Sequence, residues 1–123
     1  MMRRTWLALV GIAPFACGGT AAHSSTQMVD GGDAARGRAA IAAYGCGSCH
    51  DVPGVRGARG MVGPSLAHWS ERRIVAGYVP NDPAHLITWL TVPQSIAPGS
   101  AMPNMGVSDG EARDMAAYLY TLR

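Results

Sequence analysis

The sequence predicts an all-α domain with about three main helices joined by loops. Three stretches carry a helix start signal followed by apolar residues at helical spacing, which indicates three amphipathic helices. No stretch alternates apolar and polar residues convincingly with period two, so we expect no sheet. Residues 51–80 are rich in glycine and proline, which predicts mostly loop with a short helix near residues 66–73.

The first helix is predicted to begin near Asp33, a good N-cap after two glycines, and to run to about Tyr44. A glycine inside a helix costs about 1 kcal/mol relative to alanine. We therefore expect Gly37 to mark a close crossing with another helix, and a tolerated surface glycine is the alternative. The predicted buried face consists of Ala34, Gly37, Ile41 and Tyr44.

The second helix is predicted to begin after Asp82, an N-cap that precedes Pro83 at the first helical position. Pro93 is expected to end it, because proline cannot continue a helix. Its apolar face consists of Leu86, Trp89 and Leu90.

The third helix is predicted to begin at Ser108, because Ser108 and Glu111 form a capping-box pattern. Acidic residues at its start complement the helix dipole. Its apolar face consists of Ala112, Met115, Ala116, Leu119 and Leu122.

Residues 46–50 carry the pattern C-x-x-C-H, which is the attachment signature of a c-type haem. Each thiol, Cys46 and Cys49, can add to one vinyl group of the porphyrin, and the adjacent His50 can take the proximal iron position. A zinc site would want a second Cys/His pair, and a thioredoxin-like motif would want a βαβ pattern, but the sequence shows neither. The sequence therefore predicts one covalent haem c, with the loops wrapped around it.

A second axial ligand is expected on the far side of the iron. Met102 is the best candidate, because it lies in a turn-rich loop, residues 98–103, that can fold over the ring. Met105 is the competitor, and a five-coordinate haem is the other alternative. A His/Met pair raises the reduction potential and fills the last site, which favours electron transfer over oxygen chemistry. The candidates considered were Met61, Met102, Met105, Met115, His68 and His85.

Aromatic and basic side chains are candidates for contacts with the haem edge. Trp89 is expected to line the crevice and to donate its indole N–H to a propionate or to water, and a plain core tryptophan is the alternative. Arg72, with Arg73, is a candidate partner for a propionate, because a buried carboxylate needs a cation or donors. A solvated arginine pair is the alternative.

The N-terminal residues predict export. A basic start is followed by the uncharged residues 5–16, which is the pattern of a secretory signal and is shorter than the about 20 residues needed to span a bilayer. A buried helix is the alternative. We expect a signal peptide over residues 1–22, or a lipoprotein signal ending before Cys17, the one cysteine outside the haem pair. Residues 18–32 predict a flexible linker, and residues 33–123 the haem domain.

The charges give no sign of a nucleic-acid partner. The chain has a formal net charge of +2 and contains no lysine, and its arginines form no strongly basic stripe. Arg56 and Arg59 follow the attachment motif, whereas Asp109, Glu111 and Asp114 cluster at the start of the last helix. This asymmetry predicts a surface that could orient docking, with a bland solvated surface as the alternative.

Residues 33–123 resemble the class I cytochromes c. The resemblance implies that Pro64 lies next to the proximal histidine, with the Gly63 carbonyl orienting the ring N–H. A narrower similarity is to the cytochrome c domain fused to subunit II of some bacterial haem–copper oxidases, although the copper site and oxidase membership are not carried over. The marks are Cys46 to His50, Gly63-Pro64-Ser65-Leu66, Trp89-Leu90, Pro93-Gln94, Pro98-Gly99, Met102-Pro103-Asn104 and Ala117-Tyr118-Leu119.

Motif and resemblance together imply a one-electron carrier that cycles haem iron between the ferrous and ferric states and is not itself an enzyme. The expected partners are a terminal oxidase, a quinol–cytochrome c reductase or a dehydrogenase, in the periplasm or at the periplasmic face of a bacterial membrane. Membrane contact is expected only through a lipid on Cys17. The alternatives are a haem subunit of a dehydrogenase complex and an open-site gas-binding or peroxidatic haem protein.

Overall fold

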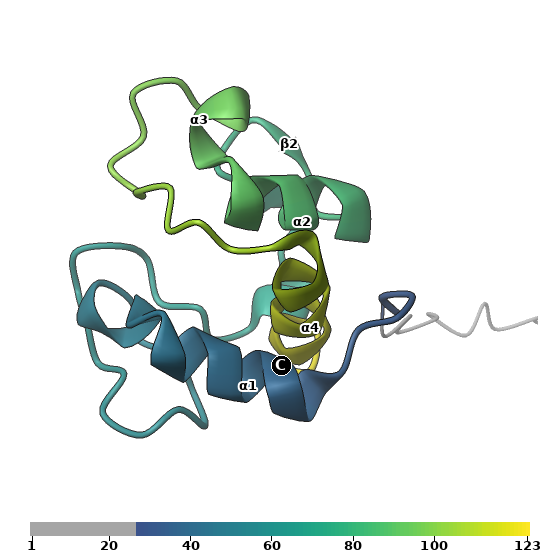
Figure 1. The fold of residues 1–123 in the computed structure, drawn as a ribbon. Helices are drawn as coiled ribbons and strands as arrows, with labels where there is room; N and C mark the ends of the chain where they lie inside the picture. Colours follow the sequence, from purple (N-terminus) through teal and green to yellow (C-terminus); the bar gives the residue numbers. More distant parts are fainter. Residues whose placement is uncertain (1–26) are drawn as a thin grey trace, which may run out of the picture.

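The computed structural model describes residues 27–123. Within that range the fold is mainly helical and has one small antiparallel sheet (Figure 1). The α-helices are α1 (Ala34–Ala43), α2 (Pro83–Thr91), α3 (Pro93–Ile96) and α4 (Asp109–Leu119). The shorter elements are the 3-10 turns η1 (Cys46–Ser48) and η2 (Trp69–Glu71) and the strands β1 (Ile74–Val75) and β2 (Val79–Pro80). The predicted signal peptide, Cys17 and the linker before residue 27 lie outside the described residues.

The centre of the fold is the crossing of α1 and α4, which lie against each other in Figure 1. Gly37 of α1 is buried at this crossing. A Cβ atom placed on Gly37 would lie 1.9 Å from the carbonyl oxygen of Asp114 in α4. The prediction that Gly37 marks a close helix crossing is therefore confirmed, because only a residue without a side chain allows this approach.

Polar contacts fasten both ends of α1 to α4. At the start of α1, the carboxylate of Asp114 accepts hydrogen bonds from the backbone N–H of Asp33 (2.7 Å) and from Nε of Arg36 (2.8 Å). At its end, the Tyr44 hydroxyl donates to Glu111 (2.8 Å). The bond from Arg36 lowers the pKa of Asp114, so this mostly buried carboxyl group is ionised and paired at neutral pH.

The predicted helix starts agree with the structure, whereas α4 ends at Leu119, before the predicted face residue Leu122. Asp33 and Asp82 are the N-caps of α1 and α2, and Ser108 forms a capping box with Glu111 at the start of α4. Pro93 follows the end of α2, as expected, but it also begins α3, a short helix that we did not predict. The backbone at Val92 (φ −138°, ψ 70°) breaks the helix between the two.

The expectation of no sheet is wrong. Strands β1 and β2 pair antiparallel, with Val75 opposite Val79, and form a small hairpin. The turn between them uses positive φ values at Ala76 (54°) and Gly77 (81°). Two-residue strands are too short to show alternation in the sequence, so this sheet could not be recognised from periodicity.

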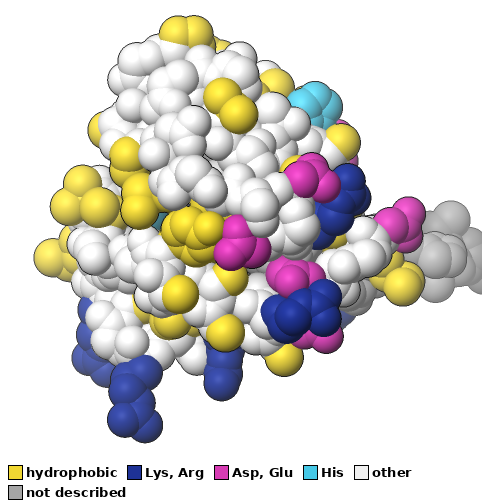
Figure 2. Space-filling model, viewed as in Figure 1, with side chains coloured by type: hydrophobic (Ala, Val, Ile, Leu, Met, Phe, Trp, Pro, Cys, Tyr) yellow, Lys and Arg dark blue, Asp and Glu magenta, His cyan; other side chains and the backbone are white. Residues whose placement is uncertain are grey.

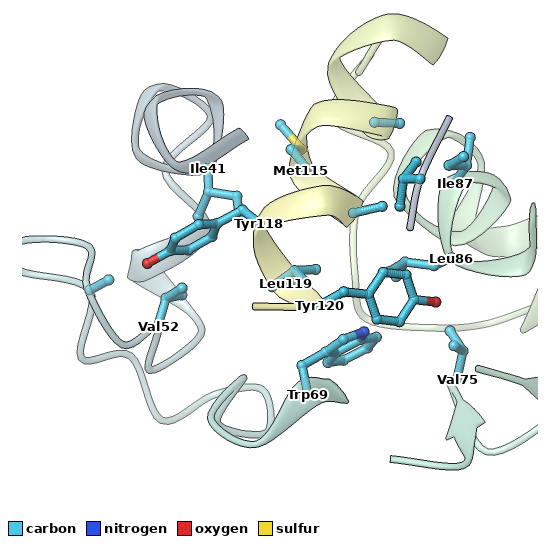
Figure 3. Packing of buried hydrophobic residues seen from close by; sticks show 14 residues of the cluster. Ile41, Val52, Trp69, Val75, Leu86, Ile87, Met115, Tyr118, Leu119 and Tyr120 are labelled. Carbon is cyan, nitrogen blue, oxygen red and sulfur yellow. The ribbon is translucent and has the colours of Figure 1, made fainter. Parts of the chain in front are cut away.

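The core lies between the helices and the hairpin. Figure 3 shows Met115 and Leu119 of α4 between Ile41 of α1 and Leu86 of α2. Tyr118 and Tyr120 point to opposite sides of α4, so this helix contributes to both halves of the core. Among residues 27–123, no helix combines the length and apolar character that crossing a membrane requires.

A buried polar contact ties the hairpin to the end of α4. Asn81 accepts a hydrogen bond from the Tyr120 hydroxyl (3.0 Å) and donates to the backbone carbonyls of Trp69 (3.1 Å) and Arg72 (3.0 Å). Burial raises the pKa of Tyr120, so its hydroxyl stays a neutral donor. Asn81 therefore joins three segments that are distant in the sequence.

Residues 27–32, which we predicted as the end of a flexible linker, instead pack on the domain. Val29 belongs to the core cluster, and the side-chain amide of Gln27 donates to the carbonyl oxygen of Asn81 (2.9 Å). A single buried valine in a short stretch without helical or strand periodicity gives no sequence signal for such a contact. Within the described residues, contacts with the domain therefore extend back to Gln27.

Substitution of Gly37 by alanine is expected to destabilise the domain by about 1–3 kcal/mol, because the new methyl group would overlap backbone atoms of α4 that cannot move aside. Gly110 in α4 is the matched control, since a Cβ there meets nothing within 4 Å. Gly110→Ala should instead stabilise by up to about 1 kcal/mol. Urea unfolding followed by circular dichroism measures both, and equal stabilities of the two variants would contradict the close crossing.

Candidate haem attachment site

The two thiols of the C-x-x-C-H pattern lie on one tight turn. The 3-10 turn η1 begins after Gly45, whose positive φ of 70° suits a residue without a side chain. The backbone N–H groups of Cys49 (3.2 Å) and His50 (2.9 Å) both donate to the carbonyl oxygen of Cys46. Cys46 and Cys49 are half-buried and free. The turn therefore keeps the two thiols and the imidazole within one compact segment.

The thiol environment does not suit the alternative chemistries. Burial raises the pKa of Cys46, so its side chain is a neutral thiol near neutral pH and not the activated thiolate of a redox nucleophile. Within residues 27–123, no group of three or more His, Cys, Asp or Glu side chains is arranged to hold a metal ion. The hairpin β1–β2 is not a βαβ unit. Zinc binding and thioredoxin-like chemistry therefore find no support here.

The imidazole of His50 is oriented by one hydrogen bond. Its Nδ1 atom lies 2.7 Å from the carbonyl oxygen of Pro64. A carbonyl oxygen can only accept, so Nδ1 is the donor, and in the neutral imidazole Nε2 then has the lone pair that a metal ligand needs. The expected acceptor was the carbonyl of Gly63, and the structure corrects this to Pro64, the next residue. The distinction is decided by the backbone path of the loop, which the sequence does not reveal.

Gly63 packs against the ring of His50 and does not accept its hydrogen bond. A Cβ on Gly63 would lie 2.3 Å from Cε1 of the His50 ring, so any side chain here would push the imidazole away. The backbone N–H of Gly63 donates to the carbonyl oxygen of Cys49 (2.8 Å) and fixes the loop against η1. Gly63 and Pro64 together form a cradle for the proximal ring.

The predicted candidates for the sixth position differ in their surroundings. Met115 is 1 % exposed within the core, and Met61 is 93 % exposed. His85 bonds to Asp82 (2.7 Å), and His68 pairs with Glu71 (3.6 Å). Met102 is half-buried in the loop between α3 and α4, whereas Met105 in the same loop is more exposed, at 45 %. Met102 therefore stays our predicted ligand.

A family model of cytochrome c matches residues 34–123, which are most of the chain. The chain belongs to the cytochrome c family. The predicted class I cytochrome c fold is thus confirmed, and the protein is an electron-transfer haem protein whose cofactor is haem c.

A curated relative narrows the comparison. The chain is 36 % identical over 91 residues to cytochrome c oxidase subunit 2 of Alkalihalophilus pseudofirmus. The match covers 72 % of this chain and 25 % of the relative, so the chain spans about a quarter of that protein. The predicted similarity to the cytochrome c domain of an oxidase subunit II is confirmed.

The residues present fit haem c. The donor set is complete on the proximal side, with two free thiols next to an imidazole whose Nε2 has the lone pair for iron. Apolar side chains that are only partly covered border the core, as expected for a cytochrome c domain that packs against a porphyrin: Leu66, Trp89, Leu90 and Val107. Cys46 and Cys49 would hold the macrocycle, and His50 the iron. When bound, the haem supplies a one-electron Fe(II)/Fe(III) couple.

The two predicted propionate partners, Trp89 and Arg72, have different surroundings in the structure. Trp89 is half-buried on α2 and belongs to the margin of the core. The guanidinium of Arg72 lies 4.9 Å from the ring of Trp69 and donates to the backbone carbonyls of Ser65 and Ala67. Arg72 thus braces the segment that follows Pro64, while its role toward a propionate stays a prediction. Arg73 is exposed.

The sequence predicted no role for Trp69 or for Gln94, although Pro93-Gln94 is one of the marks of the family resemblance. Trp69 is 5 % exposed, and its Nε1 atom is buried with no hydrogen-bond partner in the described structure. Gln94, at the start of α3, donates to the backbone carbonyl of Met102 (2.8 Å). The sequence signal that could have indicated this contact is the position of the Gln94 amide between Pro93 and the predicted ligand loop.

Only the basic half of the predicted charge asymmetry is a free surface in the described residues, because Asp114 is buried against Arg36 and Asp109 pairs with Arg113. Arg56 and Arg59 are exposed on the loop after the attachment turn, and Arg38 of α1 reaches the same loop through the carbonyl of Gly54 (3.5 Å). In Figure 2, dark-blue basic side chains project from the lower left with no acidic side chain beside them, whereas the acidic side chains toward the right lie next to other basic side chains. We call Arg38, Arg56 and Arg59 the arginine patch.

Proposed function

We propose that this protein is an exported electron carrier that donates single electrons to a terminal oxidase and has no catalytic activity of its own. The observation that carries the proposal is the match to a cytochrome c oxidase subunit 2 over the haem domain. Because the haem domain is similar to part of a cytochrome c oxidase subunit, we expect it to meet an oxidase as a separate protein. Electron transfer then requires only a transient complex.

The arginine patch supports the proposal. Arg56 and Arg59 have no acidic partner among the described residues, so their charge is available to a docking protein. They follow the segment that holds Cys46 and Cys49, so the charge lies near the attachment site in the chain. Such a patch steers association with an acidic surface and makes the rate depend on salt.

The test is stopped-flow oxidation of the reduced cytochrome by a purified haem–copper oxidase from the same organism. We expect rapid electron transfer that slows as salt rises. Arg56→Glu should lower the second-order rate constant about tenfold at low salt, because it reverses a steering charge. Arg73→Glu is the matched control, since Arg73 is equally exposed but lies beside the β1–β2 hairpin. No transfer to the oxidase would contradict the proposed acceptor, and equal effects of both variants would contradict the arginine patch.

Export and lipid attachment are part of the same proposal and rest on residues outside the structure. If Cys17 is acylated, the protein should fractionate with membranes and resist salt washing, because acyl chains bind bilayers through apolar burial. Cys17→Ser should release a soluble cytochrome with an unchanged spectrum. Mass spectrometry of the mature N-terminus decides the matter. A chain that begins at His23 without lipid mass would identify a free periplasmic carrier.

A further inference from the structure

In the loop between α3 and α4, hydrogen bonds fix the backbone of Met102 on both sides. The backbone N–H of Met102 donates to the Ser100 hydroxyl (3.1 Å), and its carbonyl accepts from Nε2 of Gln94 (2.8 Å). Among the described hydrogen bonds, none holds the backbone of Met105. Because this loop contains no helix or strand, side chains have to fix Met102 in place.

In the hydrogen bond between Gln94 and Met102, Gln94 lies on the more rigid segment. It is the second residue of α3, between Pro93 and Ala97, both of which are buried. The helix therefore cannot shift without uncovering apolar surface. Figure 1 shows the loop leaving α3 and returning to α4. The bond from Gln94 therefore joins α3 to the middle of this loop.

We propose that Gln94 is a positioning residue that holds the backbone of Met102 so that its thioether can ligate the haem iron. The inference rests on Met102 as the sixth ligand and deepens the proposed electron-transfer function. A loop ligand loses conformational freedom when it binds, which weakens the bond to the metal. A restraint already present before binding reduces this loss, so the methionine competes better with other ligands.

The test is displacement of the sixth ligand by imidazole in the ferric holoprotein, followed through the near-infrared charge-transfer band of methionine-bound haem. Gln94→Ala and Gln94→Glu should both bind imidazole about tenfold more tightly than the wild type, which corresponds to ~1.4 kcal/mol. Glutamate fails because an ionised carboxylate cannot donate a hydrogen bond. Asn104→Ala is the matched control, because Asn104 bonds only Gly106 in the same loop (2.9 Å).

Three outcomes would overturn the inference. Wild-type imidazole affinity in Gln94→Ala would show that the hydrogen bond does not position the ligand. Equal changes in Gln94→Ala and Asn104→Ala, or a fall in the urea midpoint that accounts for the change, would indicate a general loosening of the domain. An unchanged band in Met102→Ala would remove the ligand assignment itself. None of these readouts uses the oxidase, so a failed oxidase assay is distinguishable from a failed inference.

Discussion

Replacing Cys46 and Cys49 together with alanine is expected to abolish covalent haem and to leave most of the domain unfolded. The domain has a small core, and a chain of this size is marginally stable without additional support. Leu66 and Leu90 are partly buried at the edge of that core. We expect the porphyrin to complete their burial. Loss of attachment therefore removes both the cofactor and part of the apolar contact area.

The measurement is a denaturing gel stained for haem peroxidase activity, combined with far-ultraviolet circular dichroism. The double variant should give no stained band and a spectrum with strongly reduced helix signal. Ser48→Ala is the control, because Ser48 is exposed on the same turn and should keep both properties. A stained band in the double variant would refute covalent attachment at these thiols, and a native helix signal would refute the dependence of folding on haem.

Met102→Ala should keep the haem attached but open the sixth coordination position. A thioether stabilises ferrous iron, so its loss should lower the reduction potential by on the order of 0.1 V, within the roughly 0.8 V that axial ligands span. Ferrous protein should then bind carbon monoxide, and the charge-transfer band of the ferric form should disappear. Spectroelectrochemistry and a carbon monoxide titration measure these changes.

Met105→Ala is the matched control for this prediction. Met105 lies three positions further along the same loop and is 45 % exposed, and no described hydrogen bond holds its backbone. The variant should keep the wild-type potential and band. If the band is lost in Met105→Ala and kept in Met102→Ala, the ligand assignment has to be exchanged.

Most of the helices could be predicted from local sequence signals. Asp33, Asp82 and Ser108 are N-caps in the structure because capping depends on a side chain and the few backbone N–H groups that follow it. The C-x-x-C-H pattern is equally local, since both thiols and the imidazole lie on one turn. Gly37 could also be interpreted from sequence, because a glycine inside a helix has a cost that a close crossing explains.

Contacts between distant segments were decided only by the tertiary structure. The acceptor for His50 is Pro64 and not Gly63, because the loop path determines which carbonyl faces the ring. The hairpin of β1 and β2 exists through its pairing and through Asn81, which bonds the end of α4. Gln94 reaches Met102 across a turn that no periodicity describes. Sequence patterns report what a residue does to its neighbours in the chain, whereas a hydrogen bond across a loop depends on where the whole backbone returns.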